Sequence, residues 1–378
     1  MRLSKFTWFL TALIAIIYTA TLIVIRIENP HHIQAESYQR WRETYIIKQS
    51  ANRAFVNTSN NRAKPVALSE GQGYGLYVTA AAGQHGWAKS RDFDQLLNYY
   101  LAHRDYVGNH HQTPTYLMQW RQYQKNGHWA SDINSATDGD LFIAMALHQA
   151  ARVWPKRAGY YRNLERHLTS DILAYEYNPH TRSLTVGDWA TSKSKYYRLM
   201  RTSDVAPTFF DTFYQSSHDQ RWRIVKNGML DHLADLSAQH RTGLVPDFAW
   251  VTADSAKPVK PWTVASKNDG NYSANACRVP MMLANSKDPR AQKTLTRMMK
   301  FFSQRSYVTA GYTLAGKKLN HYQSASFSAP IFLAVSRNRN HGYDNLFASQ
   351  KFIFSKPLPK DNYYDATLTT IAAMEGMN

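Results

Sequence analysis

The chain has 378 residues, a formal net charge of +18 and a single cysteine, Cys277. Its length allows two ordinary domains or one all-α toroid, and the lone cysteine excludes intramolecular disulfide bonds and a thiolate metal cluster. The basic residues are scattered rather than gathered in one block, which we interpret as a surface adapted to an anionic cell envelope. The alternative is an acidic polymer ligand, either nucleic acid or polysaccharide.

The first predicted element is an uncharged, largely apolar run at residues 6–25. A run of about 20 residues is long enough for a helix that crosses the hydrocarbon layer. No small-residue cleavage site follows, which favours a retained signal anchor, and the basic flank places the remainder of the chain outside the cell. We therefore expect residues 1–27 to be a cytoplasmic tip with a transmembrane anchor, residues 28–36 a linker, and residues 37–378 the main domain.

Helical patterns follow one another beyond the linker, with few strand signals. Segments such as 74–82 and 326–335 are apolar nearly all round, whereas 157–176 and 219–239 are amphipathic and charged. Alternation of buried and surface helices predicts an α/α barrel, with an α-solenoid as the alternative. The predicted helices lie at 37–52, 70–84, 90–104, 138–154, 157–176, 204–216, 219–239, 273–286, 288–304, 321–336, 342–350 and 363–376.

Two of the apolar helices begin with acidic residues. Ser69 and Gln72 have capping-box spacing, which places Glu70 in the first turn of one helix. Nearby glycines would leave room for a bulky ligand to approach the backbone. An ordinary first-turn acid is the alternative for Glu70. The glycines are Gly71, Gly73 and Gly75.

The second of these helices lies within residues 130–154 and begins with Asp138 and Asp140. Thr137 and Asp140 again have capping-box spacing, and an acid suits the positive end of the helix dipole. A buried helix with two acids at its N-terminus indicates that they face a cleft. We interpret Asp140 as a cap and Asp138 as a chemical group.

This second stretch resembles the signature of glycoside hydrolase family 8, in which a small residue, Ser or Thr, Asp, Gly or Ala, and Asp precede an apolar helix that ends in an aromatic residue. His148 departs from the aliphatic residue that the pattern prefers. The matching residues are Ala136, Thr137, Asp138, Gly139, Asp140, Ile143, Ala144, Ala146, Leu147, Ala150 and Trp154.

The resemblance implies a fold and two roles. The fold is an (α/α)6 toroid, here behind the predicted transmembrane helix. The motif at residues 69–75 is similar to the one that carries the family's general acid, which would make Glu70 the proton donor. Asp138 would hold the sugar in the subsite where the bond is cut. Because a helix N-terminus lowers the pKa of an acid, we expect Asp138 to lie close enough to raise the pKa of Glu70.

The general base is harder to assign. An inverting glycosidase needs a second carboxylate, about 6.5–9.5 Å from the acid, to activate water. Many family members carry it in a motif similar to Tyr-Asp-Ala-x-Arg-x-Pro, where this chain has Asn275, which cannot accept a proton. A chitosanase-like branch, which the chain resembles at residues 201–204, takes its base from a Glu some ten residues upstream, where this chain has Ala265. The remaining candidate bases are Asp204, Asp254 and Asp269, of which Asp204 also fits an N-cap and Asp269 a turn.

Other candidate site residues are basic or aromatic. Arg278 lies in an apolar segment, so we expect its charge to have a partner. It could form a structural salt bridge to an inner-helix Asp, orient Asp138 or contact the substrate. Asn275 is a further candidate for substrate binding. Trp129 is the first candidate for stacking on a sugar ring, with Tyr74 and Trp262 as weaker choices. The loops at 107–133, 178–202 and 244–270 are long and rich in aromatic residues, so we expect them to be functional.

Taken with the resemblance, these patterns predict a monomeric, membrane-anchored extracellular glycosidase that hydrolyses a β-1,4-linked polysaccharide (a glucan, chitosan or an exopolysaccharide) with inversion. The alternative is a glycan-binding or polysaccharide-assembly protein that kept the groove and lost the base. A nucleic-acid-binding protein is disfavoured because the sequence has no basic cluster with interleaved aromatic residues. Nothing in the sequence suggests a metal or a cofactor.

Overall fold

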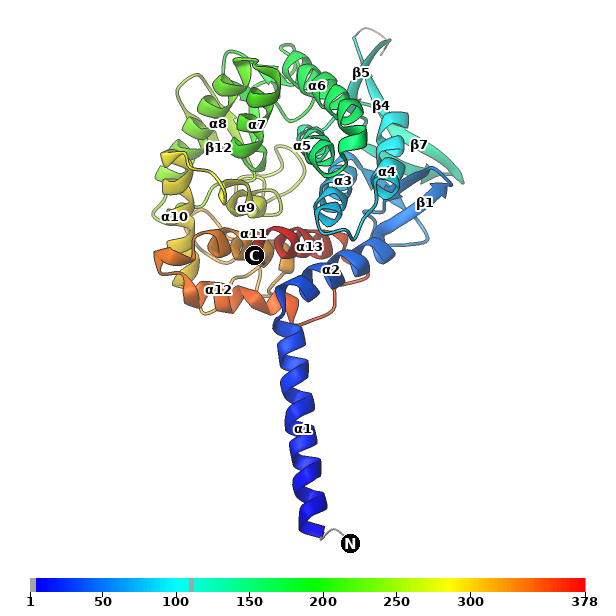
Figure 1. Ribbon diagram of the computed structural model, residues 1–378. Coiled ribbons are helices and arrows are strands. Elements are labelled where there is room, and N and C mark those ends of the chain that lie inside the picture. The colour runs from blue at the N-terminus through cyan, green and yellow to red at the C-terminus, as the bar shows by residue number, and fades with distance from the viewer. Residues whose placement is uncertain (1–4, 109–111, 378) are drawn as a thin grey trace.

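The helices of the computed structural model, which describes residues 5–108 and 112–377, form a ring with alternating inner and outer members (Figure 1). The inner helices carry the nearly continuous apolar runs and are buried, while the outer helices keep one wet face. This arrangement confirms the predicted (α/α)6 toroid. The inner helices are α3 (Ser69–Gln84), α5 (Thr137–Val153), α7 (Pro207–Ser217), α9 (Val279–Leu283), α11 (Ala325–Arg337) and α13 (Tyr363–Gly376). The outer helices are α2 (Pro30–Tyr45), α4 (Ser90–Ala102), α6 (Ala158–Tyr175), α8 (Arg221–Ala238), α10 (Pro289–Ser303) and α12 (Asp344–Gln350).

Short antiparallel sheets occupy the connections that lead from an outer helix to the next inner helix. Every strand follows an outer helix and precedes an inner one, so all the described sheets lie at the end of the ring where the inner helices begin. The paired strands are β1 (Ile46–Ser50) with β2 (Arg53–Val56), β4 (Arg104–Val107) with β5 (Thr113–Met118), and β8 (Tyr177–Asn178) with β9 (Ser183–Leu184). The three-stranded sheets are β3 (Val66–Leu68), β6 (Arg121–Lys125) and β7 (His128–Asp132), and β10 (Leu199–Arg201), β11 (Phe248–Val251) and β12 (Ala256–Pro258).

Helices α3 and α5 approach each other unusually closely at their N-termini. A Cβ atom on Gly73 would lie 2.8 Å from the carbonyl oxygen of Gly139, and one on Gly139 would lie 2.4 Å from the Ser69 hydroxyl oxygen. Gly71 and Gly75 are packed in the same way against Thr58 and Val56. These glycines therefore serve helix packing, and the prediction that they leave room for a ligand is wrong.

The predicted capping boxes are also absent. The Thr137 hydroxyl donates to the Thr185 carbonyl oxygen at 2.8 Å, and Asp140 accepts from the Met118 amide at 2.9 Å. The Gln72 side chain bonds to the backbone of strand β2 and to the Leu96 carbonyl oxygen. The side chains that the local spacing predicted as caps therefore bond to other segments of the chain, and neither helix has a side-chain cap.

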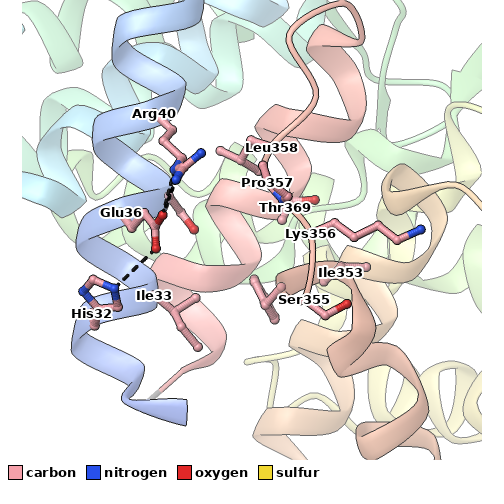
Figure 2. Close-up of a pocket in the computed structure, with 12 residues that line it drawn as sticks. His32, Ile33, Glu36, Arg40, Ile353, Ser355, Lys356, Pro357, Leu358 and Thr369 are labelled. Carbon is pink, nitrogen blue, oxygen red and sulfur yellow. Dashed lines mark hydrogen bonds and ion pairs between the residues drawn. The ribbon is translucent and has the colours of Figure 1, made fainter. Parts of the chain in front are cut away.

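The ring closes where α13 packs against α2. The Trp41 indole donates to the Thr367 hydroxyl at 2.8 Å, and the Gln34 amide reaches the Met377 carbonyl oxygen at 3.3 Å. A pocket of ≈ 210 Å³ lies at this seam, with His32, Glu36 and Arg40 of α2 on one side and residues 353–358 on the other (Figure 2). The segment predicted as a linker is helical from Pro30 because Asn29 caps the helix and Pro30 suits its first turn.

Helix α1 (Lys5–Glu28) extends away from the ring (Figure 1). Among the described residues, no helix combines the length and the apolar character needed to cross a membrane. This finding contradicts the predicted transmembrane anchor and the single-pass membrane location that was inferred from it. Hydroxyl groups interrupt the apolar run of α1: Thr11, Thr19 and Thr21 each donate to a carbonyl oxygen four residues earlier. Residues 1–4 of the predicted cytoplasmic tip lie outside the described part of the chain.

Candidate active site

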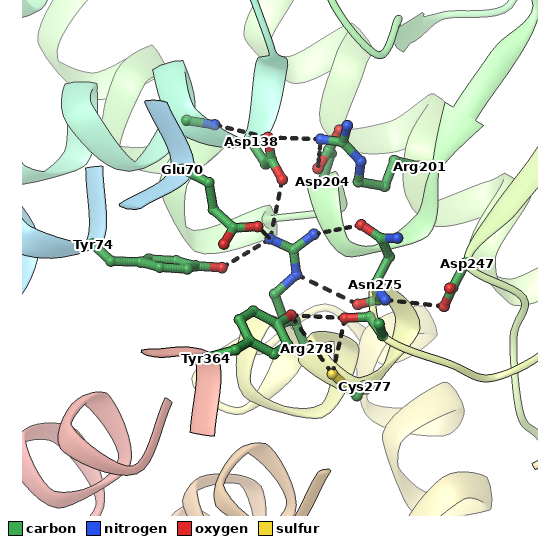
Figure 3. A network of polar contacts seen from close by, with 12 residues as sticks. Glu70, Tyr74, Asp138, Arg201, Asp204, Asp247, Asn275, Cys277, Arg278 and Tyr364 are labelled. Atoms are coloured by element: carbon green, nitrogen blue, oxygen red, sulfur yellow. Dashed lines mark hydrogen bonds and ion pairs between the residues drawn. The ribbon is translucent and has the colours of Figure 1, made fainter. Parts of the chain in front are cut away.

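A buried guanidinium joins the two acids that the sequence singled out. Arg278 ends the short 3₁₀ helix Ala276–Arg278, directly before α9. Its Nη1 donates to Glu70 Oε2 at 2.8 Å, to the Tyr74 hydroxyl at 2.8 Å and to Asp138 Oδ2 at 3.1 Å. Its Nη2 donates to Asn275 Oδ1 at 2.9 Å (Figure 3). The structure therefore brings these four predicted site residues together around one charge.

A second guanidinium, that of Arg201, lies on the other side of Asp138. Strand β10 places it opposite Phe248, and its Nη1 lies 2.8 Å from Asp138 Oδ1. Burial opposes the ionisation of Asp138, but the charges of Arg201 and Arg278 outweigh it and hold the pKa of Asp138 below its ordinary value. Asp138 is thus a carboxylate at neutral pH.

Glu70 has the opposite electrostatic character. Burial raises the pKa of Glu70 to about 7; the charge of Arg278 opposes this rise and that of Asp138 adds to it. Burial, rather than Asp138 alone, is therefore the main cause of the shift expected from the sequence. The Glu70 side chain keeps 19% of its surface exposed, so a carboxyl group that is close to half-protonated near pH 7 faces solvent beside an ionised one. This pairing is typical of a proton donor in acid catalysis.

Asn275 is held in place by a carboxylate that sequence analysis missed. Asp247 Oδ1 accepts from the backbone amides of Ser273, Asn275 and Ala276 at 3.0, 3.1 and 2.7 Å. Burial raises the pKa of Asp247 to about 7, and these hydrogen bonds act in the opposite direction. Asp247 therefore positions the turn that carries Asn275. Nothing in its local sequence distinguishes it from an ordinary residue before a strand.

Two of the three candidate bases, Asp269 and Asp254, have positions that do not suit a general base. Asp269 is buried, and its oxygens accept from the amides of Val264, Ala265 and Ser266 at 2.7, 3.1 and 2.9 Å. It fixes a turn, which was the alternative interpretation from sequence. Asp254 is exposed in the hairpin between β11 and β12.

The third candidate, Asp204, is connected to the site. It is buried in the 3₁₀ helix Thr202–Asp204, with Oδ1 3.5 Å from Arg201 Nη1. Apart from this ion pair, neither of its oxygens has a hydrogen-bond partner among the described residues. Burial raises the pKa of Asp204 to about 7 against the charge of Arg201. Asp204 is not an N-cap, because α7 begins later, after Ala206.

A further group of carboxyls lies behind the site, and we call Asp105, Asp140, Glu176 and Asp188 the arginine-free cluster. The Ser135 hydroxyl donates to Glu176 at 2.5 Å, and its amide donates to Asp188 at 2.9 Å. Burial raises the pKa of Glu176 to about 8 and that of Asp105 to about 6, and it raises the pKa of Asp140 well above its usual range. No group of His, Cys, Asp or Glu in the described ranges is arranged to hold a metal ion.

The aromatic candidates differ in exposure. Tyr74 is fully buried with its ring edge-on to Phe142, so it cannot stack on a sugar, and the prediction of a platform there is wrong. Trp129 on β7 is 40% exposed, and Trp262 is 71% exposed. Trp120, which sequence analysis missed, is 37% exposed, and its carbonyl oxygen accepts from the Ser69 amide at the start of α3. The signal that could have identified it is the aromatic-rich loop at 107–133, in which it lies.

Comparisons with known proteins agree with the glycosidase-like geometry of this site. A family model described as glycosyl hydrolases family 8 matches residues 10–375. A beta-glucanase of Niallia circulans is 29% identical over 307 residues, which cover 78% of this chain and 72% of that protein. An endoglucanase of Bacillus sp. (strain KSM-330) is 24% identical over 364 residues, which cover 86% and 75%. The apo structure of a β-1,3-1,4-glucanase from Paenibacillus sp. X4 shares the fold, with a TM-score of 0.80, 24% identity and 92% of each chain covered.

Proposed function

The chain belongs to glycoside hydrolase family 8 and is a glycosidase of the glucanase type, and from this premise we propose that it hydrolyses β-1,4-linked polysaccharide with inversion at the anomeric carbon. The observation that carries the proposal is the pair of acids on one guanidinium: Glu70 with a pKa raised to about 7, and Asp138 with a lowered pKa. Two adjacent carboxyls in different protonation states can give a proton and stabilise positive charge in the same step.

Glu70 is the proposed general acid. It gives its proton to the glycosidic oxygen as the bond to the anomeric carbon breaks, so that the leaving sugar departs as a neutral alcohol. Asp138 stays ionised between Arg201 and Arg278. There it accepts hydrogen bonds from the sugar hydroxyls and favours the positive charge that develops on the ring.

Asp204 is the proposed general base. The water oxygen forms the new bond to the anomeric carbon, and the proton that it releases passes to Asp204. Two observations support this assignment: Asp204 shares Arg201 with Asp138, and its oxygens are not committed to backbone amides as those of Asp269 are. A pKa of about 7 matches a base that works near neutral pH.

The test compares the full chain with its Glu70→Gln variant on β-1,4-linked gluco-oligosaccharides, counting new reducing ends and following the anomer first released by NMR. We expect the variant to lose on the order of 10²–10⁴-fold in rate, and the wild type to release the inverted anomer. The matched control is Glu375→Gln, because Glu375 is also a carboxyl on an inner helix but lies at the opposite end, bonded to Tyr77. Equal rates for the wild type and Glu70→Gln, with oligosaccharide binding retained, would favour the glycan-binding alternative.

A further inference from the structure

A shallow groove lies beside the sheet of β10, β11 and β12. Its volume is ≈ 580 Å³, and it is lined by hydroxyl, aromatic and cationic side chains. Sugars are bound by this combination of groups, since hydroxyls meet their polar edges and aromatic rings meet their apolar faces. We call it the basic groove, and the residues that define it are Ser192, Ser194, Lys195, Tyr197, Arg198 and Trp250.

The basic groove lies at the same end of the ring as the acid pair. Its residues belong to the α6–α7 and α8–α9 connections, both of which lead into the N-termini of inner helices. Arg198 precedes Arg201 by three residues, which limits their Cα separation to about 11 Å. Arg201, which contacts Asp138, and Trp250, which lines the groove, belong to the same antiparallel strand pair, so the groove adjoins the active site.

Positive charge is concentrated around the groove. Segments 189–198 and 250–268 carry six Lys or Arg residues and one acidic residue, Asp254, whereas the whole chain has 45 basic and 27 acidic residues. All six basic residues are exposed, and none forms an ion pair with another described residue. Their charge is therefore available to a ligand. The six are Lys193, Lys195, Arg198, Lys257, Lys260 and Lys267.

Trp250, which lines the groove, packs against a neighbouring aromatic ring. The Tyr196 ring stacks against Trp250 with 6.3 Å between centroids and an interplanar angle of 14°, and Trp189 meets its edge at 5.3 Å. The Lys195 ammonium lies 4.9 Å from the Tyr196 ring centroid. Lys195 and Trp250 both line the groove, so a sugar that packs on Trp250 can present an acidic group to the Lys195 ammonium.

We propose that the basic groove binds carboxylate-bearing units of the substrate, so that the preferred substrate is an acidic β-linked polysaccharide rather than a neutral glucan or cationic chitosan. The inference rests on the proposed function, because it concerns a chain that runs on from the same active site. A planar guanidinium at Arg198 matches a carboxylate geometrically, and several unpaired cations attract a polyanion from a distance. It also gives part of the net charge of +18 a specific purpose, in place of a general adaptation to the cell envelope.

The test measures binding and hydrolysis separately with two soluble β-1,4-glucans of matched length, carboxymethyl cellulose and neutral hydroxyethyl cellulose. Binding is measured by affinity electrophoresis with the Glu70→Gln variant, so that it does not depend on turnover. We expect tighter binding of the carboxymethyl polymer, by on the order of three- to tenfold, and loss of this preference at high salt. In the Lys195→Gln/Arg198→Gln background the ratio of the two affinities should approach one.

The matched control removes two charges elsewhere, as Lys293→Gln/Lys300→Gln on the exposed face of α10, and should keep the preference. Equal affinity for both polymers in the parent protein, or an equal loss of preference in the two double variants, would overturn the inference. So would binding of poly-L-glutamate as tight as that of the carboxymethyl polymer, because the groove would then recognise charge without sugar. Tighter binding of the carboxymethyl polymer without hydrolysis of either polymer would support the proposed role of the basic groove and overturn the proposed function instead.

Discussion

The first turn of α5 contributes one carboxyl to each of two buried clusters, and the two clusters differ in what sets the protonation state of these carboxyls. Asp138 points to the arginine-paired cluster, which we define as Glu70, Asp138, Arg201 and Arg278. Asp140, two residues later, faces the arginine-free cluster and has its pKa raised well above the usual range by burial and by the charge of Glu176. Asp138 and Asp140 are both buried, and they differ in that only Asp138 lies beside guanidinium groups.

Burial without a counter-charge raises the pKa of Asp140 well above its usual range, and a single guanidinium beside Glu70 only reduces such a rise. The two guanidiniums beside Asp138 reverse it. In the arginine-free cluster burial raises the pKa of Asp105, Asp140 and Glu176, and no guanidinium is among the causes that oppose this rise. Backbone amides supply hydrogen bonds to Asp105, Asp140 and Asp188. In the arginine-paired cluster two guanidiniums hold Asp138 ionised while Glu70 stays close to half-protonated near pH 7. The predictions below test that contrast.

Removal of Arg278 should have the largest effect. The Arg278→Met variant leaves two carboxyls without their shared partner, so we expect a loss of about 3–5 kcal/mol in the free energy of unfolding, together with loss of hydrolysis. Urea denaturation followed by tryptophan fluorescence measures the change. The double variant Arg278→Met/Glu70→Gln should recover part of the stability, because one of the two charges is gone; a single variant as stable as the wild type would remove the basis of the comparison.

Substitution of the proposed base should act on rate rather than on stability. We expect Asp204→Asn to lower kcat on the order of 10²–10⁴-fold with little change in KM, because the water loses its proton acceptor. Azide, which attacks without giving up a proton, should restore turnover and yield a glycosyl azide of inverted configuration. Asp254→Asn is the matched control on the exposed hairpin, and a wild-type rate in Asp204→Asn would assign Asp204 a structural role.

The pH dependence of hydrolysis should report the same groups. Glu70 must be protonated, so kcat/KM should fall about tenfold per pH unit above its pKa of about 7. Asp204 must be ionised, so kcat/KM should also fall as the pH drops below about 7. Initial rates on a soluble oligosaccharide between pH 5 and pH 9 give both limbs. A rate that still rises at the alkaline end would contradict the assignment of Glu70 as the acid.

The smallest expected effect belongs to the arginine-free cluster. Because the folded-state pKa of Glu176 is raised from 4.5 to about 8, its stabilising contribution is complete below pH 4.5 and is lost as the pH rises through 8. Glutamine cannot ionise, so Glu176→Gln should gain a few degrees in Tm relative to the wild type between pH 5 and pH 9. Calorimetry at the two pH values measures this shift, and a difference in Tm that does not change with pH would refute it.

Local patterns predicted the helices well and the strands poorly. The period of apolar residues marks α5 and α6 almost to their ends, since a helix that packs on both sides must repeat it. The strands are two to six residues long and lie inside long connections, where alternation is too short to register. The capping-box spacing was also misleading, because the side chains of Thr137 and Gln72 bond to the backbone of other segments instead.

The site divides in a similar way between local and tertiary information. Glu70, Asp138 and Arg278 lie in compact motifs, and the sequence was enough to select them. Asp247 acts through contacts with a segment distant in the chain, so no spacing reveals it. Arg201 lies in the 201–204 stretch of the family resemblance, but its contact with Asp138 is not visible from sequence. Asp269 was a candidate base because the sequence shows a carboxylate in a loop, whereas its oxygens are taken up by the backbone amides of the turn that it fixes.

The seam between α2 and α13 has a consequence for how the protein folds. The hydrogen bond from Trp41 to Thr367 joins residues separated by 326 positions, and Gln34 and Met377 are separated by 343. Contacts of such long range form late, because the entropy of closing the intervening chain must be overcome first. Until then the apolar flanks of α3 and α11 stay uncovered, which exposes partly folded chains to aggregation. The speed of ring closure, rather than the strength of any single helix, should therefore limit the yield of folded enzyme.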